Sequence, residues 1–244
     1  MTTANTQRVL ANLNALRQFG AYKSGVHRPT LSPQDMEARQ WLETRLREIG
    51  HEACIDGVAN VVGRARGSGP HVLCGSHLES QNHAGWLDGA LGVVYALEAA
   101  RVVVEQNGMS GPGVDVIAFS DEEGHFSGNF SFLGSQSFMG DMSDDLLDAS
   151  QDRSGRGSLR EMLASAGLQG RVRETADKSR YRAFLEAHIE QGNRLESEGL
   201  KIGIVTSIVA IWQYRIRFAG MQNHAGTTTM ATRRDAGKAL MHLW

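Results

Sequence analysis

Three short segments of the sequence concentrate acidic and imidazole side chains. The first contains His77, which Asp88 follows eleven residues later; the second contains the adjacent pair Glu122 and Glu123; the third contains His188. Carboxylates gathered in one cleft repel one another unless a cation neutralises them. Imidazole nitrogens together with carboxylate oxygens suit zinc, with manganese as a harder substitute. These residue types therefore predict a metal site.

Two metal ions would give the adjacent glutamates separate tasks. One carboxylate can bridge two ions, which together polarise a carbonyl group and generate a hydroxide. One glutamate of the 122–123 pair would bind metal, and its neighbour would act as general base. The alternative is that each histidine is a hydrogen-bonded structural residue and the glutamates are surface charge. Six other histidines have no comparable setting and are interpreted as structural or surface residues: His27, His51, His71, His83, His125 and His242.

The elements that must position these residues can be predicted from hydrophobic periodicity. Apolar residues at helical spacing predict helices over residues 4–18, 33–49 and 89–104. Short apolar runs predict strands over residues 60–64, 71–74, 114–119, 184–189 and 202–208. Strands that alternate with helices indicate an α/β fold with a largely parallel or mixed sheet covered on both faces. The three chemical segments lie at strand ends, where the functional groups of open α/β sheets gather.

The remaining segments are less regular. Residues 141–182 are polar and charged, which favours a solvated loop-and-helix insertion over a binding surface. Apolar and polar residues alternate over residues 213–218, which predicts a strand with one solvent-exposed face. Residues 233–244 are predicted to begin a helix. We therefore expect a catalytic domain over residues 1–208 and the incomplete start of a second domain over residues 209–244.

Composition argues against several classes of protein. The formal net charge of −2 gives no basic field for nucleic acid and no polybasic segment for a membrane surface. The polar first twenty residues do not resemble a signal peptide, and no apolar run is long enough to span a bilayer. Two cysteines are too few for a disulfide framework, so we expect a cytoplasmic protein with reduced thiols.

Four motifs together resemble a known family. They read GSHLESQNHAGWLDGALGV, FSDEEGHF, FLEAHIEQG and NHAGTTTMATRRDA, and they are similar to motifs of the M20 amidase family of metallopeptidase-like enzymes. This family includes N-carbamoyl-L-amino-acid hydrolases, allantoate amidohydrolases and β-ureidopropionases. The motifs occur in the family's order and cover nearly the whole chain. The resemblance implies a mixed-sheet zinc-hydrolase catalytic domain into which a smaller α/β lid domain is inserted.

The resemblance also implies a role for each residue of the metal centre. His77 and His188 would hold one divalent ion and Glu123 the other, while Asp88 would bridge the two. Glu122 would be the general base. Zinc is the favoured ion, with manganese or cobalt as alternatives.

Residues around the metal centre also have counterparts in the family. Gln191 and Asn223 would lie near the substrate, and Glu79 would support the imidazole of His77. His224 matches a lid histidine that reaches the partner subunit's site in the family's homodimers, where it stabilises the tetrahedral oxyanion.

Several positions depart from the family pattern. Glu79 stands where the family commonly has aspartate; a carboxylate one methylene longer can still accept the imidazole N–H. The usual glycine pair before the bridging aspartate reads Ala84-Gly85, and Thr229 replaces a usual proline. The resemblance further implies that the last metal-ligand histidine and the closing strands of the catalytic domain lie beyond Trp244. Without them the second metal would keep two protein ligands, which hold a catalytic metal poorly.

The predicted function is hydrolysis of the linear C–N bond of an N-carbamoyl or ureido compound by metal-bound hydroxide. An aminoacylase or dipeptidase with the same site is an alternative within enzymes. A second alternative is an inactive fragment that only binds metal or a longer homologue. A serine hydrolase that uses Ser76 and His77 is disfavoured because Ser76 lacks a nucleophile-elbow pattern.

Overall fold

A computed structural model of the chain describes residues 3–126, 132–210, 212 and 214–243. The chain forms two compact units, Met1–Gln191 and Gly192–Trp244. The domain boundary that we expect between residues 208 and 209 remains a prediction. Among the described residues, no helix has the length and apolar character needed to cross a membrane.

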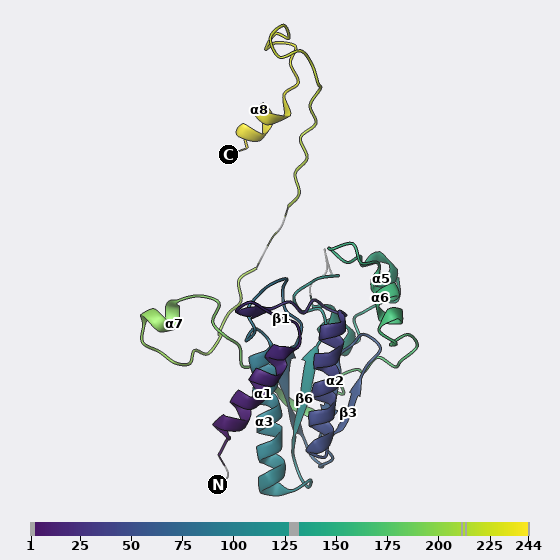
Figure 1. Ribbon diagram of the computed structural model, residues 1–244, viewed down its shortest axis with the longest axis vertical. Coiled ribbons are helices and arrows are strands. Elements are labelled where there is room, and N and C mark those ends of the chain that lie inside the picture. Colours follow the sequence, from purple (N-terminus) through teal and green to yellow (C-terminus); the bar gives the residue numbers. More distant parts are fainter. Residues whose placement is uncertain (1–2, 127–131, 211, 213, 244) are drawn as a thin grey trace. The chain divides into compact units, whose positions relative to one another are not determined.

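The first unit is built on a mixed five-stranded sheet in the order β3-β4-β6-β5-β7 (Figure 1). Its strands are β3 (Glu52–Ile55), β4 (Val61–Arg64), β5 (His71–His77), β6 (Val114–Phe119) and β7 (Tyr181–Leu185). β5 pairs in parallel with β6 on one side and with β7 on the other, whereas β4 is antiparallel to both β3 and β6. A mixed α/β fold is therefore confirmed. A two-stranded hairpin, β1 (Ala21–Tyr22) with β2 (Gly25–Val26), precedes the sheet.

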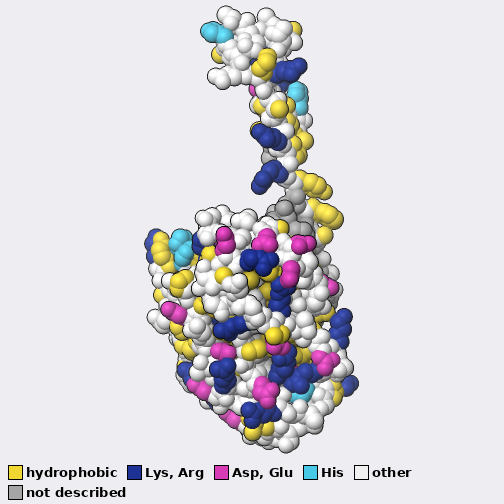
Figure 2. Space-filling view, turned by 90° about the vertical axis from the view of Figure 1, so that its right-hand side faces the viewer, with side chains coloured by type: hydrophobic (Ala, Val, Ile, Leu, Met, Phe, Trp, Pro, Cys, Tyr) yellow, Lys and Arg dark blue, Asp and Glu magenta, His cyan; other side chains and the backbone are white. Residues whose placement is uncertain are grey.

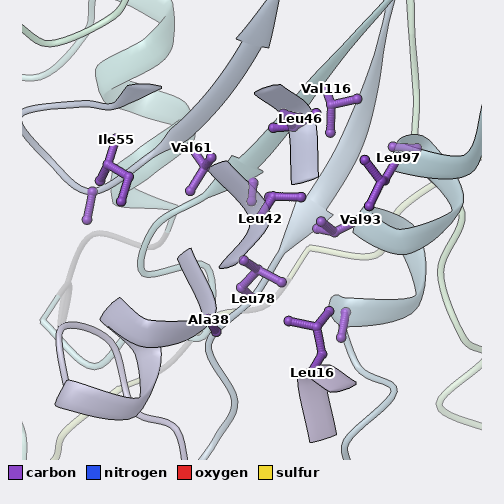
Figure 3. Close-up of a cluster of buried hydrophobic side chains, with 14 of the residues drawn as sticks. Leu16, Ala38, Leu42, Leu46, Ile55, Val61, Leu78, Val93, Leu97 and Val116 are labelled. Carbon is purple, nitrogen blue, oxygen red and sulfur yellow. The ribbon is translucent and has the colours of Figure 1, made fainter. Parts of the chain in front are cut away.

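Three long helices lie over one face of this sheet, α1 (Thr6–Gln18), α2 (Pro33–Glu48) and α3 (Ala90–Asn107). Ser32 caps α2 by accepting a hydrogen bond from the Asp35 amide, and Pro33 occupies the first turn, as predicted for this helix start. Figure 3 shows part of the core, in which Leu42 and Leu46 of α2 belong to the same buried cluster as Val93 and Leu97 of α3. Burial of these side chains fixes both helices against the strands that carry the candidate site.

A smaller cluster covers the opposite face of the sheet. Val62, Leu73 and Ile117 point away from the main core and pack with Phe138 of α4 (Leu133–Met139). Their neighbours Val61 and Val116 belong to the main core, as the alternation of side chains along a strand requires.

The polar insertion at 141–182 differs in part from the solvated segment that we expected. It contains α5 (Asp145–Ala149) and α6 (Leu159–Ser165), which is capped by a Ser158–Glu161 capping box. Leu147, Leu159 and Leu163 are buried in the main core cluster. The charged residues dominate its composition, but its leucines still anchor the segment.

The predicted strands near the end of the first unit and in the second unit need correction. β7 ends at Leu185, so it lies earlier than the predicted strand at 184–189. Residues 202–208 form no strand, and neither do residues 214–218; Gln213 lies outside the described residues. An apolar run becomes a strand only where another strand pairs with it, and Ile204 and Ile208 are instead 88% and 90% exposed.

The described residues of the second unit contain two short helices. They are α7 (Arg194–Ser197) and α8 (Ala236–Met241), which is capped by the side chain of Asp235. The helix predicted over residues 233–244 is thus shorter, because Asp235 caps its start; Trp244 lies outside the described residues.

Acidic and basic side chains are interspersed on the face seen in Figure 2, without one large area of a single sign. The visible distribution fits the small net charge of −2.

Candidate metal centre

Three neighbouring parallel strands bring the segments that contain His77, Glu122 and His188 to one edge of the sheet. β6, β5 and β7 run in the same direction, so their carboxyl ends lie together. His77 is the last residue of β5, Glu122 follows the end of β6 at Phe119, and His188 follows the end of β7 at Leu185. The sheet topology therefore explains how residues distant in sequence meet at one site.

His77, Asp88 and His188 form a compact group of possible metal ligands. One ligand atom from each lies within 4.8 Å of the others, and this is the one such group found among the described residues. Oδ1 of Asp88 is 3.2 Å from Nε2 of His188 and 3.8 Å from Nε2 of His77. Two imidazole nitrogens and a carboxylate oxygen form a donor set suited to zinc.

The main chain aims both imidazoles toward this group. Nδ1 of His77 is 3.0 Å from the main-chain oxygen of Glu79, and Nδ1 of His188 is 2.9 Å from that of Ile189. A proton on each Nδ1 satisfies these contacts and leaves the lone pair of each Nε2 directed at Asp88. Since metals bind the deprotonated nitrogen, the three residues fit a divalent ion.

The carboxylates around His77 influence its charge. Burial favours the neutral imidazole, but the charges of Glu79, Glu122 and Glu123 outweigh it and raise the pKa of His77 above its ordinary value. The negative charge around His77 attracts a proton and would equally attract a metal cation.

Glu122 lies beside the ligand group, where a general base could reach a water molecule bound to a metal ion. Its Oε2 is 3.5 Å from Nε2 of His77, and its side chain is partly buried. Burial raises the pKa of Glu122, and the carboxylates of Glu79 and Glu123 add to this effect against the opposing charge of His77. A raised pKa brings a carboxylate closer to the range in which it can take up and release a proton near neutral pH.

Glu123 is not brought into the compact group. Its carboxylate and its main-chain oxygen both accept hydrogen bonds from Nε2 of Gln81, at 3.1 Å and 2.8 Å. The structure thus brings together three of the four metal ligands that the resemblance implies. The fourth, Glu123, is hydrogen-bonded to Gln81 instead. Sequence reasoning missed Gln81, since an exposed glutamine in a loop carries no distinctive signal.

The two oxygens of Asp88 have different partners. Oδ1 faces the histidines, whereas Oδ2 accepts a hydrogen bond of 2.7 Å from Nε2 of Gln191. Gln191 therefore lies at the ligand group itself, and its expected place near the substrate remains a prediction. Gly89, which follows Asp88 and opens α3, has a φ of +65°, and a Cβ there would lie 2.5 Å from the ring of His77. Only glycine fits this close approach.

Glu79 supports the site differently from the expectation. Its main-chain oxygen, rather than its carboxylate, contacts Nδ1 of His77. The carboxylate is fully buried and binds Nη2 of Arg39 and the main-chain amide of Glu122. Burial alone would raise the pKa of Glu79, but Arg39 and His77 lower it below its ordinary value, so it is an anion. Its longer side chain reaches the turn that carries Glu122.

Ser76 does not form a serine–histidine pair. Its hydroxyl donates a hydrogen bond of 2.5 Å to Oε1 of Glu186, and its side chain is almost completely buried. His77 directs Nε2 toward Asp88 instead. The partner of Ser76 is thus a carboxylate, and no histidine lies at its hydroxyl as a serine–histidine pair requires.

Asn223 and His224 lie in the second unit and are exposed. Nδ1 of His224 accepts hydrogen bonds from the amides of Gly226 and Thr227, at 3.1 Å and 3.2 Å. The proton of the neutral imidazole therefore resides on Nε2, where it can be donated.

Comparison with curated proteins shows close similarity to amidohydrolases. The chain is 37% identical over 242 residues to the N-carbamoyl-L-amino-acid amidohydrolase of Paenarthrobacter aurescens, covering 96% of this chain and 57% of that protein. It is 34% identical over 225 residues to the allantoate amidohydrolase of Bacillus subtilis, covering 90% of this chain and 54% of that protein. The chain thus spans little more than half the length of these relatives.

Solved structures show the same similarity at the level of the fold. An amidase of the hydantoinase/carbamoylase family from Burkholderia phymatum matches with a TM-score of 0.81 and 46% identity, covering 98% of this chain and 58% of that chain. A second amidase of that family, from Burkholderia ambifaria, matches with a TM-score of 0.74 and 31% identity, covering 98% and 59%. The resemblance of the four motifs to N-carbamoyl-L-amino-acid hydrolases and allantoate amidohydrolases is therefore confirmed.

The family model that matches is that of peptidase family M28, over residues 60–191. This range begins just before β4 and contains β5, β6 and β7, together with the compact ligand group and Glu122. The match covers more than half of the 244-residue chain. The chain belongs to peptidase family M28.

Proposed function

We propose that this chain carries the metal centre of an amidohydrolase that cleaves the linear C–N bond of N-carbamoyl-amino acids or of ureido compounds such as allantoate. The compact group of His77, Asp88 and His188, with Glu122 beside it, carries the proposal. The similarity to N-carbamoyl-L-amino-acid and allantoate amidohydrolases supports the substrate class.

Each residue of the site has a proposed part in the reaction. Bound divalent metal supplies Lewis acidity and lowers the pKa of water. His77 and His188 would hold an ion through Nε2, with Asp88 between them. Glu122 would take a proton from the attacking water and give it to the leaving nitrogen. Hydrolysis of an N-carbamoyl group consumes one water and yields the free amine, carbon dioxide and ammonia.

The proposal also includes a second ion and the identity of the metal. Asp88 would serve both ions, and the hydrogen bond from Gln191 would keep its carboxylate oriented. Glu123 would hold the second ion after release from Gln81. We propose zinc for the site because two imidazoles and a carboxylate suit it, with manganese or cobalt as substitutes.

Three residues outside the ligand group, namely Gln191, Asn223 and His224, also have proposed parts that the resemblance implies. His224 would donate its Nε2 proton to the developing oxyanion in the partner subunit's site, a role supported by the amide hydrogen bonds to Nδ1. Gln191 and Asn223 would contact the substrate. We propose that residues 209–244 begin a lid domain, that the whole protein forms a homodimer through that lid, and that it acts in the cytoplasm. The two free cysteines are compatible with a reducing compartment.

A substrate panel tests the proposed function. We expect the purified protein with added Zn²⁺ or Mn²⁺ to hydrolyse N-carbamoyl-amino acids or allantoate faster than N-acetyl-amino acids and dipeptides. The Glu122→Gln variant keeps the size of the side chain but cannot act as a base, so kcat should fall by roughly 10²- to 10⁴-fold while metal binding persists. Preference for the acetyl compounds or dipeptides would instead identify an aminoacylase or dipeptidase.

A chain that binds metal without hydrolysis is the second candidate, favoured by the position of Glu123, which Gln81 holds outside the ligand group. Zinc titration monitored by calorimetry separates the two candidates. Binding at His77, Asp88 and His188 without turnover of any panel substrate would support metal binding alone.

A further inference from the structure

A buried chain of charges runs from α2 to the turn that carries Glu122. Nη2 of Arg39 donates to Oε2 of Glu79 at 2.6 Å, and Nε of Arg39 donates to Oδ2 of Asp35 at 2.9 Å. All three side chains have no solvent-exposed surface. A charge removed from water at this depth is costly to leave unpaired, so the contacts of Arg39 closely determine its geometry.

The Glu79 carboxylate links Arg39 to the backbone of the candidate base, Glu122. One of its oxygens binds Arg39, and the other accepts a hydrogen bond of 2.5 Å from the main-chain amide of Glu122. The carboxylate therefore ties the position of the Glu122 backbone to the position of the guanidinium.

Arg39 also holds the other end of the same turn. Its Nη1 donates to the main-chain oxygen of Phe119 at 3.3 Å and to that of Ala59 at 2.7 Å. Phe119 ends β6, and the chain then turns through Asp121, which adopts a left-handed φ of +54°. A turn with such a residue needs contacts at both ends to hold it.

We propose that Arg39 is a positioning residue that acts through Glu79 to fix the backbone of Glu122, and with it the orientation of the base toward His77. This inference rests on the proposed role of Glu122 as the base. It assigns Arg39 to the reaction although the guanidinium contacts no ligand atom of the metal group.

The chemistry of the side chain explains why an arginine occupies this position. The planar guanidinium serves four acceptors at once, namely two carboxylates and two main-chain oxygens. A lysine would keep the charge but could not present donors in this fixed fork. Arg39→Lys therefore removes the geometry while it keeps a cation beside Glu79.

The experiment compares three arginine-to-lysine variants. Arg39→Lys is the test. Arg45→Lys is the matched control on the same helix, since Arg45 pairs with Glu48 in an exposed position. Arg180→Lys disturbs a different buried carboxylate, Asp115, which Arg180 binds with two hydrogen bonds. The Arg180→Lys variant therefore measures how much activity is lost when a buried ion pair away from Glu122 is disturbed.

Two readouts are needed, kinetics and amide hydrogen exchange of residues 119–126. For Arg39→Lys we expect kcat to fall by about tenfold to a hundredfold with KM changed by less than about twofold. The Glu122 amide should exchange at least about tenfold faster than in the parent protein, because its acceptor is no longer fixed. Arg45→Lys should change neither readout, and Arg180→Lys should leave exchange of residues 119–126 unchanged.

The outcomes separate this inference from the proposed function. If the parent protein hydrolyses no substrate, the proposed function fails, and unchanged exchange of the Glu122 amide in Arg39→Lys would still overturn the positioning role. Equal kinetic losses in Arg39→Lys and Arg180→Lys would also overturn it. If Arg39→Lys does not fold, Glu79→Gln replaces it; the neutral amide weakens the acceptor of the Glu122 amide, and faster exchange at that amide is expected.

Discussion

At the residue scale, Gly89 is the position where the smallest substitution should have the largest effect on the metal group. Gly89 has a left-handed φ, and a Cβ there would lie 2.5 Å from the ring of His77. Gly89→Ala should displace the imidazole, weaken zinc binding and lower the free energy of unfolding by about 1–3 kcal/mol. Calorimetric zinc titration and thermal unfolding measure the two effects.

The chain offers a matched control for this prediction. Gly85 lies in the same loop, and a Cβ there would meet nothing within 4 Å. Gly85→Ala should therefore bind zinc as the parent protein does. Equal zinc affinity of the Gly89→Ala and Gly85→Ala variants would show that the contact with His77 does not determine the site.

The sequence made the metal group predictable, but not the residues that support it. His77, Glu122 and His188 could be found because each lies at or just after the end of an apolar run that predicts a strand. Arg39 was missed, because its contacts with Glu79 and Phe119 join segments distant in sequence. One signal for it exists in the sequence. Arg39 lies at helical spacing from Leu42 and Leu46, on the buried stripe of α2, and a charge there requires buried partners.

At the element scale, an ion pair links α1 to α3. Arg8 binds both oxygens of Glu98 at 2.7 Å, and the Glu98 side chain is only 3% exposed. Burial would raise the pKa of Glu98, but the hydrogen bonds from Arg8 and the Asn5 amide lower it. The folded protein thus favours the carboxylate, so this interaction stabilises the fold above the unfolded pKa of about 4.5 and is lost as pH falls through the folded pKa.

Glu98→Gln should remove this pH-dependent stabilisation. We expect the variant to lose about 1–2 kcal/mol of unfolding free energy at pH 7, since a hydrogen-bonded charge is replaced by a neutral amide. The difference from the parent protein should shrink below about pH 4. Urea denaturation at several pH values measures it. Glu105→Gln is the control, because Glu105 is an exposed partner of Arg8, and a loss as large as that of Glu98→Gln would contradict the argument.

The elements themselves were predictable where local pattern and tertiary partners agree. The helices α1, α2 and α3 and the strands β4 and β6 lie close to their predicted ranges, because an apolar stripe or run there meets a buried face. Residues 202–208 show the opposite case, since their apolar run pairs with no strand among the described residues. The short elements β3 and α4 were missed. Their existence depends on partners in β4 and in the sheet face rather than on a long periodic pattern.

At the scale of the whole molecule, the core is confined to the first unit. Every residue of the two core clusters precedes residue 182, and His77, Asp88 and His188 precede residue 192. No described residue from 192 to 243 is buried. The second unit instead exposes large apolar side chains, among them Ile202 at 83% and Trp212 at 78%.

We therefore expect residues 1–191 to fold without the second unit. Because the core and the ligand group remain intact, a 1–191 fragment should unfold cooperatively within about 1 kcal/mol of the 244-residue chain and bind zinc with the same affinity. It should also associate less at high concentration, since the exposed apolar side chains of the second unit are gone. Urea denaturation, zinc calorimetry and light scattering measure these properties. His188→Ala within the fragment is the control that should abolish zinc binding, and a fragment without a cooperative transition would show that the second unit stabilises the core.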